Sequence, residues 1–385
     1  MSGSTLGGRA AVVGIGATAF TKDSGRSELA LAAEAVRAAL ADAGLAPGDV
    51  DGMVTFTMDT SPEITVAQAA GIGELSFFSR VHYGGGAACA TVQQAALAVA
   101  AGVAEVVVCY RAFNERSGRR FGAGAVRREP TAEGVALGWV MPFGLLTPAS
   151  WVAMAARRYL HAYGLEPEVF GHVAVTARRH AAANPAAYFH RRPITLADHA
   201  ASRWIAEPLR LLDCCQETDG GQALVVTSTE RARTLRHPPA VITAAAQGAG
   251  RAQEQMTGFY RDGLTGLPET AVVARRLWAD SGLRPADIDV GILYDHFTPY
   301  VLMQLEEFSF CSPGEGGAFV ASGALPLNTH GGQLGEAYLH GMNGIAEAVR
   351  QLRGTSVNQV PGTARVLVTA GTGVPTSGLI LGADG

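Results

Sequence analysis

Apolar and polar residues follow two different periods in the N-terminal part of the chain. A short apolar run ending in glycines, typical of a buried strand, is found in AAVVGIGATAF (10–20). Apolar residues at helical spacing, followed by a glycine, predict an amphipathic helix in SELALAAEAVRAALADAGL (27–45). A turn and a second strand are predicted in APGDVDGMVTF (46–56). This order of elements is typical of an α/β protein.

The same pattern returns near the C-terminus. The segment LADAGLAPGDVDGMVTF (40–56) matches WADSGLRPADIDVGILY (278–294). The matched residues are Asp42, Gly44, Pro47, Asp49 and Asp51 in the first copy and Asp280, Gly282, Pro285, Asp287 and Asp289 in the second. A glycine pair, a helix and a strand follow in both copies, starting at Gly85-Gly86 and at Gly331-Gly332. Two copies of one α/β unit predict a duplicated layered fold.

The repeat divides the chain into two halves. We expect an N-terminal half at 1–240, which carries an insertion at about 113–240, and a C-terminal half at 241–385. The insertion includes an apolar segment, 141–164, which prolines interrupt too often for a membrane span. We interpret that segment as an apolar wall.

The composition of the chain limits which kinds of partner and which cellular compartment we expect. Only 17% of the 385 residues are charged and the net charge is −4, so nothing attracts nucleic acid or an anionic membrane. The N-terminus has no signal-peptide pattern, and the five cysteines form neither a disulfide framework nor a paired metal motif. We expect a cytoplasmic protein.

Cys89 is the first candidate for chemistry. It follows three glycines at the expected start of an alanine-rich helix, where the helix dipole and free N–H groups make a thiol more acidic. A nucleophile is one interpretation. A small buried residue is the other, because free cysteine is among the most buried residue types.

Four segments resemble the thiolase superfamily, and within it the sterol carrier protein type of thiolase. They are RRPITLADHAASRWIAEPLRLLDCCQETDGGQALVVTS (191–228), GLRPADIDVGILYDHFTPY, CSPGEGG (311–317) and LPLNTHGGQLGEAYLHGMNGIAEAVRQLRG (325–354). The resemblance implies a duplicated five-layer αβαβα thiolase fold, with two mixed sheets around central helices and an insertion in the first half. It also implies a homodimer formed through the first half.

The resemblance fails at the positions that carry thiolase chemistry. Counting back from GVAEVVV (102–108) places the nucleophilic cysteine of the family on Gly85, although an alignment shift of four residues would return it to Cys89. Tyr338 stands where the family has the histidine of Gly-His-Pro, and Tyr294 replaces the first histidine of His-Asp-Cys-Phe. No cysteine occurs in TAGTGVPTSG (369–378). Without these groups an acyl-enzyme cannot form.

This pattern resembles the steroid side-chain-cleaving aldolases of actinobacteria. The resemblance implies retro-aldol cleavage of a β-hydroxyacyl-CoA, releasing a 17-keto steroid and propionyl-CoA from a 17-hydroxy steroid. It also implies a complex with the zinc-ribbon and OB-fold domain of an enoyl-CoA hydratase. We expect no cofactor besides the CoA thioester of the substrate.

We predict that Tyr294 and Tyr338 share the roles of base and acid. A tyrosine acts as a base near neutral pH only beside a cation or strong hydrogen-bond donors. We expect Tyr294 to be the base because Asp295 and His296 are close in sequence. The predicted supporting residues, which would hold the thioester oxygen or orient a tyrosine, are His296, Asp295, His330, His340 and Asn328.

Glycines and arginines complete the predicted site. Glycines let a thioester approach the backbone closely, and the candidates are Gly85, Gly86, Gly331, Gly332, Gly371 and Gly373. The basic segment 114–130 is either a solvated loop or a phosphate-binding loop. Its candidates for the CoA phosphates are Arg119, Arg120, Arg127 and Arg128. We predict no metal site, because no histidine pair has a recognised ligand spacing.

Two alternatives to an aldolase stay open at the level of sequence. One is a non-catalytic thiolase-like subunit that binds acyl-CoA or lipid, since a fold does not fix a function. The other is a thiolase, such as an acetyl-CoA acetyltransferase, that uses Cys89.

Overall fold

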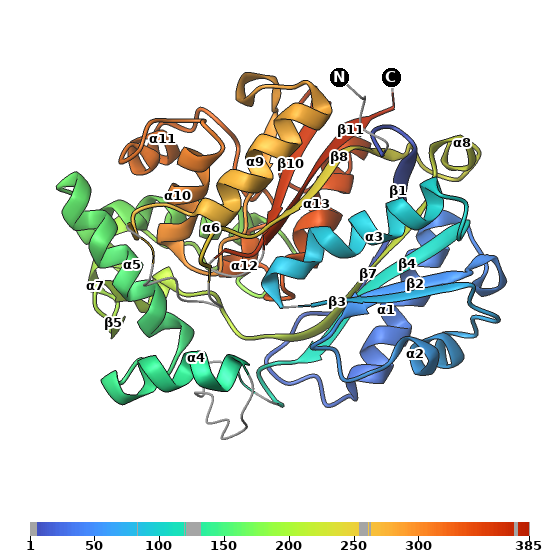
Figure 1. The fold of residues 1–385 in the computed structure, drawn as a ribbon, viewed down its shortest axis with the longest axis horizontal. Helices are drawn as coiled ribbons and strands as arrows, with labels where there is room; N and C mark the ends of the chain where they lie inside the picture. The colour runs from blue at the N-terminus through green and yellow to red at the C-terminus, as the bar shows by residue number, and fades with distance from the viewer. Residues whose placement is uncertain are drawn as a thin grey trace.

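Nine strands of the described residues form one mixed sheet, in the order β3-β2-β4-β7-β1-β8-β11-β10-β9 (Figure 1). The structure is a computed structural model that describes residues 6–82, 84–118, 120, 132–253, 261, 263–372 and 376–384. The strands are β1 (Ala10–Ala17), β2 (Gly52–Phe56), β3 (Phe77–Val81), β4 (Val106–Asn114), β7 (Asp219–Ser228), β8 (Ala240–Gly248), β9 (Val290–Ile292), β10 (Arg365–Ala370) and β11 (Thr376–Ala383). Most strand residues are buried, which agrees with their apolar sequences.

The sheet consists of two halves with the same topology. In the first half β2 is parallel to β4, β4 is antiparallel to β7, and β7 is antiparallel to β1. In the second half β9, β10, β11 and β8 repeat these three pairings in the same order. The predicted duplication is therefore confirmed.

The repeated residues make the same hydrogen bonds in both halves. Asp51 accepts the N–H groups of Glu105 and Val106, and Asp289 accepts those of Ala364 and Arg365. Each aspartate thus ties the start of one strand to the start of its parallel neighbour. Gly44 and Gly282 end equivalent helices in the left-handed conformation, with φ of 73° and 70°.

The two half-sheets meet at β1 and β8, which pair only through Ala11 with Val241 and Val12 with Ala240. The two separate sheets that we expected are therefore joined into one. Pairing at this seam satisfies backbone groups that two edge strands would otherwise leave open.

Helices complete the five layers expected of the fold. Two of them, α3 (Ala88–Ala100) and α13 (Met342–Arg353), lie in the centre against strands of both half-sheets (Figure 1). The first half is covered outside by α1 (Glu28–Ala43) and α2 (Glu63–Ala70), and the second by α9 (Pro268–Ser281) and α10 (Thr298–Glu307). Shorter helices are α8 (Thr229–Ala232), α11 (Gly316–Ser322) and α12 (Gly332–Gly335).

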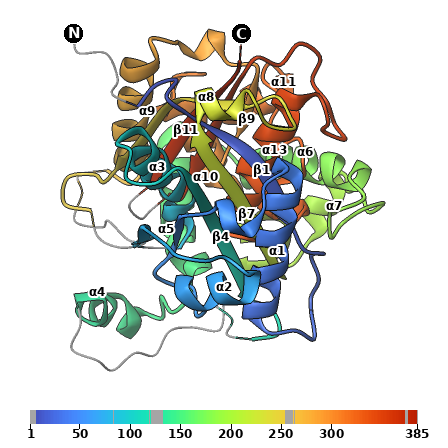
Figure 2. The same cartoon turned by 90° about the vertical axis from the view of Figure 1, so that its right-hand side faces the viewer.

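The segment between β4 and β7 adds four helices among its described residues. They are α4 (Ala132–Val140), α5 (Pro148–Tyr163), α6 (Gly171–Ala183) and α7 (Leu196–Ala201), followed by the hairpin β5 (Trp204–Ala206) and β6 (Leu209–Arg210). The range 113–240 that we expected to be an insertion is too long, because β7 is a central strand of the first half. In both views α4 projects from the body (Figures 1 and 2). Within the described ranges no helix is long and apolar enough to cross a bilayer.

Candidate active site

Two tyrosine hydroxyl groups from the second half lie beside the glycine turn of the first half. Tyr294 follows β9 and Tyr338 follows α12, and their Oη atoms are 3.2 Å apart. The N–H of Tyr294 donates to Thr369 Oγ1 at 2.9 Å, and its carbonyl accepts from Gln304 Nε2 at 2.8 Å. The N–H of Tyr338 donates to Thr218 Oγ1 at 2.8 Å. Residues far apart in the sequence therefore hold the predicted pair in place.

The turn at Gly84 and Gly85 has no room for side chains at these two positions. A Cβ atom on Gly85 would lie 2.1 Å from Tyr294 Oη, and one on Gly84 would lie 2.9 Å from the ring of His340. Both distances are below 3.0 Å, which real Cβ contacts essentially never show. The resemblance places the thiolase nucleophile at Gly85. A tyrosine hydroxyl occupies the space that such a side chain would need.

Cys89 lies in the core, away from any solvent. It is 0% exposed on the first turn of α3, and its Sγ is 3.7 Å from the carbonyl oxygen of Val368. Burial raises the pKa of the thiol above its ordinary value, although a nucleophile requires the thiolate. This burial supports the interpretation of Cys89 as a packing residue and argues against a thiolase that uses it.

A chain of buried charged groups fixes the ring of His340. Arg111 Nε donates to His340 Nδ1 at 3.2 Å, so the neutral ring carries its proton on Nε2. Arg111 Nη1 pairs with Asp59 Oδ1 at 2.5 Å, and its guanidinium lies over the ring of Phe113. Burial, assisted by the charge of Arg111, lowers the pKa of His340 well below its usual value. His340 therefore supplies an N–H donor to the site and no positive charge.

The side chain of Asp295 points towards α12. Its carboxylate accepts the N–H groups of Gln333 (2.8 Å) and Leu334 (3.4 Å) and fills the space beside Gly332. Burial raises its pKa. Asp295 thus shapes the second glycine turn, which is not the activating role that its place next to Tyr294 suggested.

His296 packs against Tyr294, with 4.8 Å between the ring centroids. Its Nδ1 is buried and has no hydrogen-bond partner among the described residues. Burial lowers its pKa to about 3, so the ring is neutral at physiological pH. The ring contact agrees with a role of His296 in orienting Tyr294, whereas a neutral ring supplies no cation beside the hydroxyl.

Asn328 acts on the backbone next to Tyr294. Its Oδ1 accepts from the N–H of Leu293 at 2.7 Å and its Nδ2 donates to the carbonyl of Leu293 at 2.9 Å. His330 lies further back, with Nε2 4.0 Å from Glu336 Oε2. Both residues therefore support the end of β9 and the second glycine turn.

The second glycine turn faces other residues than we expected. Cβ atoms on Gly331 and Gly332 would meet Ala181 of α6 and the carboxylate of Asp295, at 2.6 and 1.9 Å. Atoms of the protein itself therefore occupy the space beside these two glycines. The close backbone approach to the first turn comes from Gly371, where a Cβ atom would lie 2.4 Å from Gly86 Cα.

Four of the predicted binding residues lie outside the described residues: Gly373, Arg119, Arg127 and Arg128. Arg120 is the one candidate for the CoA phosphates that the structure describes. Its side chain is 48% exposed, and its Nε pairs with Glu217 Oε2 at 2.7 Å.

Burial raises the pKa of both tyrosines. Their hydrogen bond has opposite effects on the two: it lowers the pKa of Tyr294 and raises that of Tyr338. Either hydroxyl can be the donor of this hydrogen bond, so the two tyrosines titrate as a coupled pair. Ionisation of Cys215 or Glu115 raises the pKa of both tyrosines further, but burial raises the pKa of these two groups as well.

Sequence reasoning missed Arg111 and Glu115. Both belong to the run VVVCYRAFNE (106–115), in which a charged residue stands inside an otherwise apolar strand. That combination is a usable signal, because charged side chains are almost never fully buried unless they are paired. On sequence, the end of this run belongs to the basic segment 114–130.

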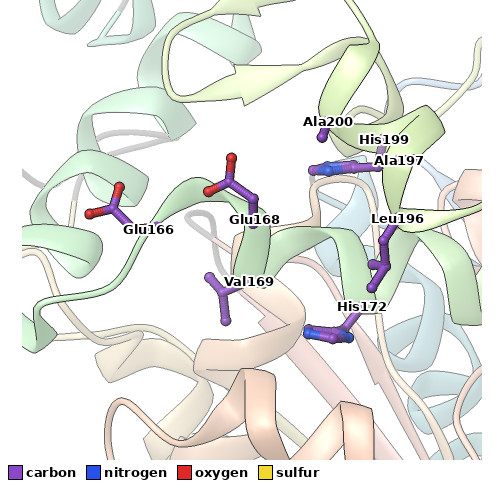
Figure 3. A pocket seen from close by; sticks show the side chains of 8 residues that line it. All are labelled: Glu166, Glu168, Val169, His172, Leu196, Ala197, His199 and Ala200. Carbon is purple, nitrogen blue, oxygen red and sulfur yellow. The ribbon is translucent and has the colours of Figure 1, made fainter.

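A surface cavity of about 530 Å³ lies between α6, α7 and the short helix Pro167–Phe170 (Figure 3). Its lining residues are Glu166, Glu168, Val169, His172, Leu196, Ala197, His199 and Ala200. His199 is already bound to Asp213, with 2.7 Å from Nε2 to Oδ1. None of the predicted site residues lines this cavity. In the part of the chain that the structure describes, no group of three or more His, Cys, Asp or Glu side chains could hold a metal ion.

Two family descriptions match the chain, one in each half. The description "Thiolase, N-terminal domain" matches residues 10–230, and "Thiolase C-terminal domain-like" matches residues 250–382. The chain belongs to the thiolase family. The predicted family and thiolase fold are thereby confirmed.

Curated members of the family are similar over their whole length. The chain is 67% identical to the steroid side-chain-cleaving aldolase of Thermomonospora curvata, over 99% of this chain and 100% of the relative. It is 66% identical to the 17-hydroxy-3-oxo-4-pregnene-20-carboxyl-CoA lyase of Mycobacterium tuberculosis, over 98% of this chain and 100% of that protein. A solved structure named Ltp2-ChsH2(DUF35) aldolase superposes with a TM-score of 0.95 at 67% identity, covering 99% of both chains.

Proposed function

We propose that this chain cleaves the side chain of a steroid acyl-CoA by a retro-aldol reaction. The substrate is a 17-hydroxy steroid with a three-carbon acyl-CoA side chain, and the products are a 17-keto steroid and propionyl-CoA. The observation that carries this proposal is the tyrosine pair, with hydroxyls 3.2 Å apart in the space that a thiolase nucleophile would need. Both full-length relatives are named as carbon–carbon cleaving enzymes of this kind, which supports the predicted aldolase.

The reaction makes three demands on the site. A base takes the proton of the β-hydroxyl group while the carbon–carbon bond breaks and a ketone forms. Hydrogen-bond donors hold the negative charge that moves onto the thioester oxygen. An acid then protonates the α-carbon of the enolate.

Tyr294 and Tyr338 meet the first and third demands. We assign the base to Tyr294, whose Oη is the closest atom to the position of a side chain at Gly85, where the family carries its nucleophile. Tyr338 is then the acid, and the 3.2 Å between the two Oη atoms lets a proton pass between them to restore the pair. The Nε2–H of His340 and the backbone of Gly84–Gly86 lie next to the pair and provide donors for the enolate oxygen.

The assembly around this site is part of the same proposal. The structural relative carries the name of a second component, ChsH2(DUF35), and we infer a comparable partner with a zinc-ribbon and OB-fold domain. A homodimer through the first half agrees with β3, an edge strand whose Phe78 is 62% exposed. Binding of the CoA phosphates by the basic segment that includes Arg120, and a cytoplasmic location, stay predictions.

Product analysis tests the reaction. The purified chain, with and without its partner, is incubated with the 17-hydroxy steroid acyl-CoA and separately with a 3-oxoacyl-CoA plus CoA. We expect ketone and propionyl-CoA from the first mixture and no thiolysis in the second. Thiolysis would contradict the proposal, and no product in either mixture would favour a binding subunit.

Removal of single hydroxyl groups tests the residues. We expect Tyr294→Phe and Tyr338→Phe each to lower kcat by about 10²- to 10⁴-fold, since each loses a group that moves a proton. Thermal melting serves as the control and should stay close to that of the parent chain. Near-parental turnover in both variants would refute the assignment.

A further inference from the structure

The carboxylate of Glu336 lies two residues before Tyr338 and has no role in the reaction described so far. Glu336 is 1% exposed. Within the described ranges it has no arginine or lysine partner, and His330 Nε2 is 4.0 Å from its Oε2. A buried carboxylate is costly unless hydrogen-bond donors satisfy its oxygens, so the donors around Glu336 indicate what it does.

Two buried asparagines from different parts of the chain hold this carboxylate. Asn184, which ends α6, donates from Nδ2 to Glu336 Oε1 at 3.0 Å. Asn343, in the first turn of α13, donates from Nδ2 to Glu336 Oε2 at 2.8 Å. The two asparagines are 5% and 0% exposed. Glu336 therefore joins the helices between β4 and β7 to the central helix of the second half.

The orientation of each asparagine amide is fixed by the backbone. Asn184 Nδ2 also donates to the carbonyl of His330 at 2.9 Å, and Asn343 Nδ2 also donates to the carbonyl of Ala337 at 3.2 Å. Rotating either amide by half a turn would place an oxygen against a carbonyl oxygen. Both groups therefore present donors to Glu336, and the network is complete only if each oxygen of its side chain is an acceptor.

This network surrounds the loop that carries Tyr338. Residues 336–341 form neither a helix nor a strand. Their backbone is held from outside instead: the N–H of Tyr188 donates to the carbonyl of Glu336 at 2.9 Å, and the N–H of Tyr338 donates to Thr218 Oγ1 at 2.8 Å. Side-chain contacts with other segments, and not a regular backbone ladder, therefore set the position of Tyr338.

The hydroxyl of Tyr338 needs accurate placement, because the proposed proton transfers involve it. Its Oη is 3.2 Å from Tyr294 Oη, slightly longer than most hydrogen bonds between hydroxyl groups. A further displacement of about 1 Å separates the pair, and a misplacement of that size costs about 10²-fold in rate.

We propose that Glu336 is the positioning residue for Tyr338. Its carboxylate, held by Asn184 and Asn343, fixes the loop so that the hydroxyl of Tyr338 stays within hydrogen-bond distance of Tyr294. The inference rests on the proposed function and deepens it. Glu336 acts through Tyr338 and does not touch the substrate.

Glu336→Gln in the full-length chain with its partner tests the network, because the amide keeps the size of the side chain and turns one acceptor into a donor. That donor faces an N–H group of Asn184 or Asn343, and neither amide can rotate to accept it. We expect kcat to fall by about 10²-fold with little change in KM.

Glu306→Gln is the matched control. Glu306 is a partly buried carboxylate on α10 that is likewise held by side-chain and backbone donors, since it accepts hydrogen bonds from Tyr159 Oη and from the N–H of Gly314. Its partners lie outside the loop 336–341. This variant should keep the kcat of the parent, and a loss equal to that of Glu336→Gln would contradict the specific role of Glu336.

A double-mutant cycle separates positioning from a general loss of structure. If Glu336 acts through the hydroxyl of Tyr338, then Glu336→Gln should have no further effect on kcat in the Tyr338→Phe background. A second loss of about 10²-fold in that background would overturn the inference, because the carboxylate would then act independently of the hydroxyl.

Asn343→Ala provides a second variant that leaves the carboxylate in place, bound to Asn184. It should also lower kcat with little change in KM, and its effect should likewise disappear in the Tyr338→Phe background. A parental kcat in folded Glu336→Gln or Asn343→Ala, with inactive tyrosine variants, would overturn the positioning role alone. A parent enzyme that does not cleave the steroid acyl-CoA would overturn the proposed function and the positioning role with it.

Discussion

The closeness of Gly85 to Tyr294 makes a single methyl group a sensitive probe of the site. In Gly85→Ala the new Cβ atom would start 2.1 Å from Tyr294 Oη, whereas ordinary contacts begin at 3.4 Å. The hydroxyl must therefore retreat by roughly 1.3 Å, which breaks its 3.2 Å contact with Tyr338 Oη. A misplacement of about 1 Å in a catalytic group costs roughly a hundredfold in rate, or about 2.7 kcal/mol of transition-state stabilisation.

The assay is steady-state cleavage of the 17-hydroxy steroid acyl-CoA, together with thermal melting. We expect kcat/KM of Gly85→Ala to fall by about a hundredfold and the overpacked site to lose about 1 to 3 kcal/mol of stability. Gly73→Ala is the control, because nothing lies within 4 Å of a Cβ atom at Gly73. Full activity in Gly85→Ala would refute the geometry. A lower melting temperature with unchanged kcat/KM would refute the role of the hydroxyl.

Three further predictions concern buried groups. Asp59→Asn leaves Arg111 buried without its counter-charge and should lower the free energy of unfolding by about 3 to 5 kcal/mol, measured by chemical denaturation. The control is Glu34→Gln at an exposed ion pair, which should lower it by less than about 1 kcal/mol. Equal losses in the two variants would contradict the burial argument. Cys89→Ala should keep the cleavage activity, and loss of turnover in a folded variant would restore the nucleophile. The pKa of His296 is about 3 in the fold, below the ordinary 6.5, so the unfolded chain binds the extra proton. Stability should fall by up to about 1.4 kcal/mol per pH unit as the pH drops from 6.5 towards 3, and His296→Phe should flatten this dependence in denaturation curves.

The sequence was sufficient to predict the fold because its repeat carries the bonds that shape the sheet. Asp51 and Asp289 were matched on sequence alone, and in the structure each accepts two N–H groups from the neighbouring strand. The seam between β1 and β8 was not predicted. A single short run of two residue pairs between distant strands leaves no local pattern in the sequence.

The tyrosine pair was predictable for a similar reason, since both residues stand at positions where the family carries its chemistry. Their surroundings were not predictable. Which way Asp295 and Gly331 face depends on contacts with α12 and α6, and sequence proximity to Tyr294 was a poor guide.

The place of β1 in the sheet affects how the chain is made. Ala10 pairs with Ser228 of β7, and Val12 pairs with Ala240 of β8. At about 5 to 20 residues per second, a ribosome needs roughly 10 to 50 seconds to synthesise both neighbours after β1. For that time the nascent chain presents an apolar strand with two open edges, which is a template for aggregation. We therefore expect the yield of this protein in cells to depend on chaperones that bind during translation.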